Sequence, residues 1–218
     1  MDRMAPDSRK RQMGRAMALL LTGSLAALCL AACAARSLPP GFAPPADART
    51  IPGVPAHEQR TQQCGPAALA SVLNHYGSAL TPDDIARDIY RPAQLGTLNL
   101  DMALYPRGIG FRTRWFDGSL DDLVEAVRAG RPLIVMVDRG MAPLELDHFL
   151  VVTGYDVDGL VVLAGGNGPE HRSWAGLDGQ WRKTGRWTLE VLPAGDGTPD
   201  GTPDGTGNDT GNDTGEGR

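Results

Sequence analysis

The apolar side chains between residues 57 and 193 change their spacing about half-way along that segment. In the first half they recur every three or four residues, which gives a helix one apolar face. In the second half they form continuous runs of four to six residues, which are typical of buried strands. Helices followed by strands predict an α+β fold with an antiparallel sheet in its C-terminal part.

The expected helices have recognisable start signals. The helix over 64–76 has Pro66 in its first turn, where a missing N–H costs nothing because that group would be unpaired anyway. The helices over 81–90 and 119–129 each follow a hydroxyl residue and carry acidic side chains in their first turn, a capping signal. Thr97 is expected to cap a further short helix that ends near Tyr105.

The expected strands lie mostly in the second half of the segment. The polar stretch 153–159 predicts a hairpin turn between two of them. The stretch around His171 is polar throughout and is expected to be a loop. The expected strands are 111–116, 132–137, 149–152, 160–163 and 187–192.

The N-terminus has the layout of a secretory signal. Five basic residues in 1–15 precede an apolar run over 16–32, which is short for a spanning helix of roughly 20 residues. The run ends in Leu-Ala-Ala followed by Cys33 and resembles the bacterial lipobox. That resemblance implies cleavage before Cys33 and lipidation of its thiol, with a plain cleaved signal or an uncleaved anchor as alternatives. Because Ala34 follows, and not Asp, the periplasmic face of the outer membrane is the expected destination.

Composition divides the chain into four parts. Residues 1–32 are the expected signal peptide, 33–56 a Pro- and Ala-rich tether, 57–193 one folded domain, and 194–218 a disordered tail. The chain has 21 basic and 26 acidic residues, and without the first 32 residues it has 16 against 24, a net charge of −8. This charge argues against nucleic acid as a partner, and no Cys/His spacing fits zinc, so we expect neither metal nor cofactor.

Cys64 is expected to be a free thiol at a helix N-terminus. Cys29 leaves with the signal and Cys33 carries lipid, so Cys64 has no disulfide partner. Unpaired N–H groups at a helix start favour a thiolate and lower a thiol pKa. The alternative is a small buried side chain that happens to precede a helix.

A nucleophilic Cys needs a histidine that is near in space and distant in sequence. His75 lies on the same helix roughly 16 Å away and is excluded. His57 and His171 lie in irregular segments. His148 precedes the apolar run of a strand, which would hold it rigidly, so it is the expected base, with a structural histidine as the alternative.

Two motifs together are more specific. Gln-Cys-Gly-Pro-Ala-Ala-Leu-Ala at 63–70, with His-Phe-Leu-Val-Val-Thr-Gly-Tyr-Asp at 148–156, resembles the bacteriocin-processing (double-glycine leader) peptidases. The resemblance is closer to their stand-alone relatives in exported bacterial lipoproteins. These are papain-like cysteine peptidases, so it implies a papain-like fold in which N-terminal helices carry the Cys and the C-terminal sheet carries the His.

The resemblance also implies roles for single residues. Cys64 matches the nucleophile, His148 its proton acceptor, and Gln59 the glutamine whose amide faces the oxyanion, although Gln62 and Gln63 compete for that role. The family's orienting Asp is missing, because Ala164 stands at about its place. Asn167, three residues later, is a candidate orienter or a turn residue.

The resemblance therefore predicts a lipid-anchored, extracytoplasmic cysteine peptidase that acts on a peptide or protein through an acyl-enzyme. The missing Asp leaves open a catalytically weak or inactive peptide-binding lipoprotein. A non-proteolytic acyl transferase or amidase that uses the same Cys–His dyad is a further alternative.

Overall fold

The computed structural model describes residues 38–58, 62–141, 144, 146–165 and 168–195. Three predicted site residues, Cys33, Gln59 and Asn167, lie outside the described residues. The expected signal peptide and nearly all of the expected tail lie outside them as well.

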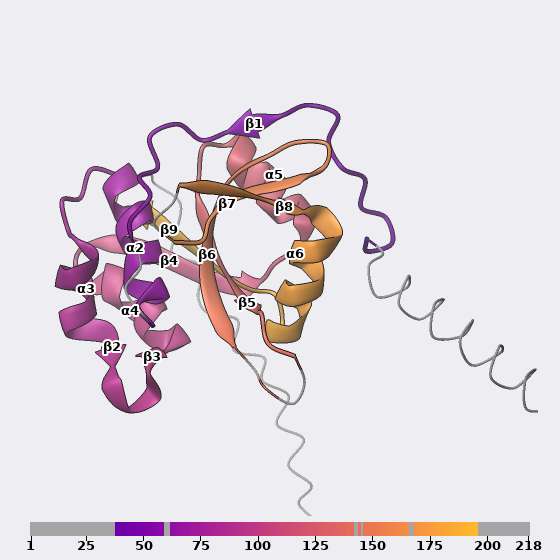
Figure 1. Ribbon diagram of the computed structural model, residues 1–218. Coiled ribbons are helices and arrows are strands. Elements are labelled where there is room, and N and C mark those ends of the chain that lie inside the picture. Colours follow the sequence, from indigo (N-terminus) through magenta and orange to yellow (C-terminus); the bar gives the residue numbers. More distant parts are fainter. Residues whose placement is uncertain (1–37, 59–61, 142–143, 145, 166–167, 196–218) are drawn as a thin grey trace, which may run out of the picture.

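The N-terminal half of the domain is helical and forms one side of the molecule (Figure 1). Its elements are α2 (Cys64–His75), α3 (Pro82–Ile89), β2 (Tyr90–Arg91), the 3-10 turn η1 (Pro92–Gln94), β3 (Gly96–Thr97) and α4 (Asn99–Gly108). Within the described ranges, no helix has the length and apolar character needed to cross a membrane.

The predicted start signals of two helices are confirmed. The hydroxyl of Thr81 accepts from the Asp84 N–H, and the Asp84 carboxylate in turn accepts from the Thr81 N–H. Ser119 and Asp122 form the same reciprocal cap at the start of α5 (Leu120–Arg128). Each pair satisfies two N–H groups that a helix start leaves unpaired.

The predicted Thr97 cap is wrong. Thr97 lies in β3, where it is paired with Tyr90, and α4 begins only at Asn99, after Leu98. Pairing with β2 holds Thr97 in an extended conformation, so its hydroxyl does not cap the helix.

The C-terminal half supplies most of a seven-stranded sheet in which all the strand pairs are antiparallel, as the α+β prediction required. The strand order is β4-β9-β5-β6-β7-β8, and β1 (Arg49–Thr50) pairs with the far end of β6. The other strands are β4 (Phe111–Asp117), β5 (Leu133–Asp138), β6 (Asp147–Tyr155), β7 (Gly159–Leu163), β8 (Pro169–Ser173) and β9 (Trp187–Pro193).

Two predictions for the second half are wrong. The hairpin turn is shorter than expected, because β6 continues to Tyr155 and only 156–158 separate it from β7. His171 lies in β8 rather than in a loop, and β8 leads into α6 (Trp174–Trp181) and the 3-10 turn η2 (Arg182–Thr184). β8 is the last strand of the order, and its residues are alternately exposed and half-buried. Such a strand can carry polar side chains because neither of its faces is fully buried.

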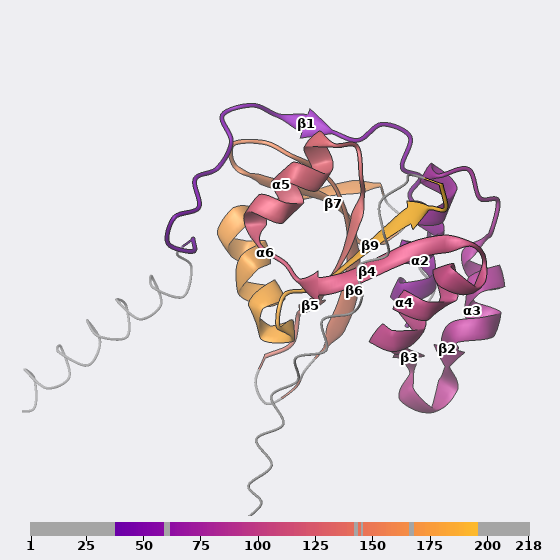
Figure 2. The same ribbon diagram turned by 180° about the vertical axis from the view of Figure 1, so that it is seen from behind.

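Both faces of the sheet are covered, which explains the continuous apolar runs. Alternate residues of β5 enter two different clusters. Leu133, Val135 and Val137 pack with α5 and α6, whereas Ile134 and Met136 pack with α2, α3 and α4. The view from behind shows the same division, with α5 and α6 on one side of the sheet strands and the N-terminal helices on the other (Figure 2). Burial on this second face fixes α2 against the sheet.

Candidate active site

Cys64 begins α2 and is held close to the sheet. Its side chain is half-buried and packs against the cluster that joins α2 to β6. The next residue, Gly65, is buried, and a Cβ built on it would lie 2.9 Å from Thr97 Cβ and 3.0 Å from Met102 Sδ. A glycine at this position therefore lets the first turn of α2 approach β3 and α4 closely.

The backbone N–H groups of Phe149, Gly65 and Cys64 itself favour a thiolate on Cys64 and lower its pKa. Burial has the larger effect, however, and raises the pKa of the Cys64 thiol above its ordinary value. The expectation of a lowered thiol pKa is therefore wrong, because a helix start that is packed against a sheet loses the solvation on which a thiolate depends.

His148 is the second residue of β6, at an end of the strand that β7 does not cover. The pairing of β6 with β7 begins at Val151, opposite Leu163. The imidazole Nε2 of His148 lies 3.1 Å from the carbonyl oxygen of Ala164, the residue that follows β7. Burial lowers the pKa of His148, and the contact with Ala164 opposes that shift only in part.

The structure brings Cys64 and His148 to the same place. The Phe149 N–H that favours the Cys64 thiolate belongs to the residue next to His148, and α2 packs against β6. Arg139 also lowers the pKa of both groups, as expected for two side chains near one guanidinium. The head of the first helix of the domain thus lies beside a strand whose residue His148 is 84 positions later in the chain.

The other three histidines have partners elsewhere. His57 Nε2 lies 2.7 Å from the Asn74 side-chain oxygen, near the end of α2 opposite Cys64. His75 contacts the carbonyl of Gly130 at 3.3 Å. His171, on β8, lies 3.0 Å from an Asp156 carboxylate oxygen. Of the four, only His148 adjoins the residue whose N–H faces the Cys64 sulfur.

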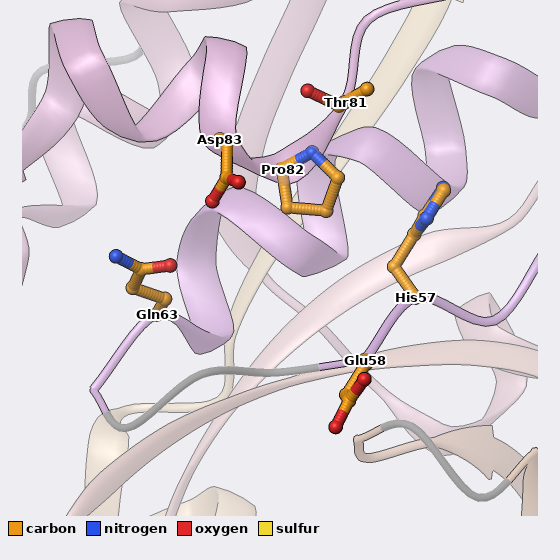
Figure 3. Close-up of a pocket in the computed structure, with 6 residues that line it drawn as sticks. All are labelled: His57, Glu58, Gln63, Thr81, Pro82 and Asp83. Atoms are coloured by element: carbon orange, nitrogen blue, oxygen red, sulfur yellow. The ribbon is translucent and has the colours of Figure 1, made fainter.

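The two glutamines that compete with Gln59 have neighbours in β2 and α3. Gln62 has a positive φ of 65°, and its side-chain oxygen accepts from the Tyr90 hydroxyl at 3.3 Å. Gln63 lines a cavity of about 340 Å³ together with His57, Glu58, Thr81, Pro82 and Asp83. Figure 3 shows Gln63 and Asp83 on one side of this cavity, with His57 and Glu58 on the other. The residue that precedes Cys64 in the chain is therefore part of the cavity wall.

Two backbone groups of this site were not predicted from the sequence. The N–H of Phe149 and the carbonyl of Ala164 contact the thiol and the imidazole, respectively. Only the position of Ala164, where the resemblance places an Asp, gave any signal. Among the described residues, no group of three or more His, Cys, Asp or Glu side chains is arranged to hold a metal ion.

This arrangement agrees with the comparison with known families. The sequence profile of the peptidase C39-like family matches residues 51–187, more than half of the chain. The chain belongs to this family of cysteine peptidases. A comparison with curated protein sequences gave no match.

Solved structures of C39 peptidases share the fold. A C39-like peptidase from Bacillus anthracis superposes with a TM-score of 0.57 at 15% identity, covering 67% of this chain and 98% of that one. The peptidase domain of Streptococcus ComA, a bifunctional ABC transporter of a quorum-sensing pathway, gives a TM-score of 0.55 at 27% identity. That match covers 65% of this chain and 99% of the ComA domain. The papain-like α+β prediction is confirmed.

Proposed function

We propose that this C39-like chain is a lipid-anchored, extracytoplasmic cysteine peptidase in which Cys64 and His148 form the reacting pair. The observation that carries the proposal is the packing of α2, which begins at Cys64, against β6, which carries His148 near its start. The family supplies the reaction class, peptide-bond cleavage. The substrate is then a peptide or protein segment that enters beside the start of α2.

The pair works by general-base catalysis in this proposal. Its members rest as a thiol and a neutral imidazole, because burial raises the pKa of Cys64 and lowers that of His148. His148 takes the thiol proton as the sulfur attacks the peptide carbonyl, and it then gives that proton to the leaving amine. Water releases the acyl group from the sulfur, with His148 again acting as the base.

The tetrahedral intermediate needs donors for its oxyanion. The N–H of Cys64 lies at a helix start, where such groups are unpaired within the helix. We assign the second donor to the side-chain amide of Gln59, as the family resemblance implies. We assign substrate residues on one side of the scissile bond to the cavity that Gln63 lines.

Peptide hydrolysis by purified variants tests the reacting pair. With fluorescein-labelled denatured casein as substrate, we expect Cys64→Ser and His148→Gln each to lower the rate roughly 10³-fold or more. His171→Gln is the matched control. His171 lies on β8 and contacts Asp156, so this substitution should leave the rate unchanged. A His148→Gln variant as active as the control would remove His148 from the mechanism.

The anchoring part of the proposal rests on residues 1–34. Cys33 follows an apolar run and the Leu-Ala-Ala sequence that resembles a lipobox, and Ala34 follows it. A lipid on Cys33 places the domain at a membrane surface without a spanning helix. We therefore assign the protein to the periplasmic face of the outer membrane.

Metabolic labelling with a radioactive fatty acid tests the anchor. Wild type should carry label and a Cys33→Ser variant should not, and density-gradient fractions should place wild type in the outer membrane. An Ala34→Asp variant should keep its lipid and move to the inner membrane. Unlabelled wild-type protein would contradict the anchor without bearing on the peptidase.

One observation favours a second candidate, a papain-like module that binds peptides and cleaves them slowly or not at all. His148 contacts a neutral carbonyl where the resemblance places a carboxylate, so its imidazolium is less well stabilised. A peptide that binds both wild type and Cys64→Ser with equal affinity, and that neither cleaves, would support this candidate. A trapped acyl-enzyme that passes its acyl group to an amine would support a transferase.

A further inference from the structure

The ring of His148 is held by main-chain oxygen. Its Nε2 lies 3.1 Å from the carbonyl oxygen of Ala164, which follows the last residue of β7. Ala164 is 9% exposed and belongs to the cluster under α5 and α6. Packing of Ala164 therefore holds the residue that supplies the acceptor.

This contact fixes the tautomer of the neutral ring. A carbonyl oxygen can only accept, so Nε2 must carry the proton when the two are hydrogen-bonded. The lone pair is then on Nδ1, and Nδ1 is the nitrogen left to take the proton of a thiol. The contact also restricts rotation of the ring about its bond to Cβ.

We propose that the main-chain carbonyl of Ala164 positions His148 for catalysis, in place of a side-chain orienter. The inference rests on the proposed function, in which His148 is the base. It assigns to Ala164 a positioning role that its methyl side chain cannot perform, and it makes Asn167 unnecessary for orienting the ring.

A carbonyl orients the ring but brings no negative charge. The charges that reach His148 are therefore those of neighbouring side chains from the elements packed around it. Arg139 and Arg172 lower the pKa of His148, and Glu170 raises it. The neighbouring charged groups on the strands are Asp147 on β6 and Asp138 on β5 with its partner Lys183, and α2, which begins at Cys64, packs against β6.

NMR of the full chain labelled with ¹⁵N-histidine tests the tautomer directly. At pH 7.5 we expect the His148 signals, assigned by their loss in His148→Gln, to show a protonated Nε2 and an unprotonated Nδ1. An Nδ1-protonated ring would overturn the proposal. This readout needs no substrate, so it stands apart from any test of hydrolysis.

An amide-to-ester change tests the contribution to rate. Replacing Gly165 by glycolic acid in the full chain turns the Ala164–Gly165 amide into an ester, whose carbonyl is a weaker acceptor. We expect kcat on labelled casein to fall about fivefold, the worth of roughly one net hydrogen bond, with KM unchanged. A folded ester variant with wild-type kcat would overturn the proposal.

The two proposals can fail separately. If His148→Gln loses hydrolysis while the ester variant keeps its kcat, the proposed peptidase mechanism is supported and the role of Ala164 is refuted. Unchanged hydrolysis in His148→Gln would remove the peptidase mechanism itself.

Discussion

Gly65 lies directly after Cys64, and its surroundings leave no room for a side chain. An added Cβ would lie 2.9 Å from Thr97 Cβ and 3.0 Å from Met102 Sδ, closer than such atoms normally approach. The first turn of α2 would have to move away from β3 and α4 to admit it. Since Cys64 is part of that turn, its sulfur would move relative to Phe149.

We therefore expect Gly65→Ala to lower casein hydrolysis by at least about tenfold, since small misplacements of reacting groups cost that much or more. Its free energy of unfolding should fall by about 1–3 kcal/mol through overpacking. Gly179→Ala in α6 is the control, because nothing lies within 4 Å of the added methyl group. Equal activity in the two variants would mean that the close approach of α2 does not position the thiol.

The pH dependence of Cys64 alkylation tests the resting state of the pair. A raised pKa means that the thiolate fraction is small at pH 7 and grows only as the pH passes the ordinary value of 9.0. The rate with iodoacetamide should still be rising above pH 9 in wild type. A plateau reached below pH 7 would show a preformed thiolate–imidazolium pair instead.

At the scale of elements, helix caps set local stability. Thr81 caps α3 and accepts from the Asp84 N–H. Thr81→Ala should lower the free energy of unfolding by about 1 kcal/mol, the usual worth of such a cap, as measured by chemical denaturation. Thr81→Ser keeps the hydroxyl and should lose much less, and equal losses in the two variants would mean that the hydroxyl does not cap α3.

The same cap gives a dependence on acid. Hydrogen bonds from Thr81 lower the pKa of Asp84 to about 2, from an ordinary value of 3.8. The stabilisation is therefore complete above about pH 4 and is lost as the pH falls toward 2. An Asp84→Asn variant should show less acid destabilisation than wild type in urea titrations at pH 2.5 and pH 5. If the free energy of unfolding changes equally between pH 2.5 and pH 5 in the variant and in wild type, Asp84 is not the group responsible.

Sequence patterns predicted the elements that have local signals. Capping signals predicted α3 and α5. Continuous apolar runs predicted β5 and β7, because both faces of those strands are buried. β8 was missed because it lies at the end of the strand order and needs no apolar face. The α6 helix had an unused signal, since Trp174, Leu177 and Trp181 recur at helical spacing after a Ser.

For the site, sequence reasoning predicted the side chains but not the main-chain groups. Cys64 and His148 were proposed from their residue types and from their expected places on a helix and a strand, and the structure has them on α2 and β6. Nearly every residue has a main-chain N–H and every residue has a carbonyl, so the sequence cannot single out those of Phe149 and Ala164. Only the fold shows that these two belong to the site. The direction of the thiol pKa was wrong for a related reason, because a helix start is visible in the sequence and its burial is not.

At the scale of the whole molecule, residues before α2 run along the sheet part of the domain and pack against it. β1 pairs with β6, and the Phe42 ring lies 5.1 Å from that of Trp174 on α6. Asp47 contacts both Arg128 and Tyr155. The packed part of the chain thus includes residues N-terminal to 57, within the stretch expected to be a tether.

This segment should contribute to the stability of the domain. We expect Phe42→Ala to lower the free energy of unfolding by about 2 kcal/mol, because a half-buried aromatic side chain loses its contact with Trp174. Val157→Ala is the control, since Val157 is exposed and should change little. A Phe42 variant as stable as the control would mean that the segment lies on the domain without stabilising it.

The central claim is that the thiol of Cys64 and the imidazole of His148 meet. It is tested most directly with 1,3-dibromoacetone, whose two reactive carbons flank one carbonyl, on the full chain carrying Cys29→Ser and Cys33→Ser so that Cys64 is the single thiol. After proteolysis, mass spectrometry should find one bridge that joins Cys64 to His148. A reagent attached to Cys64 with His148 unmodified, or bridged to another residue, would contradict the account.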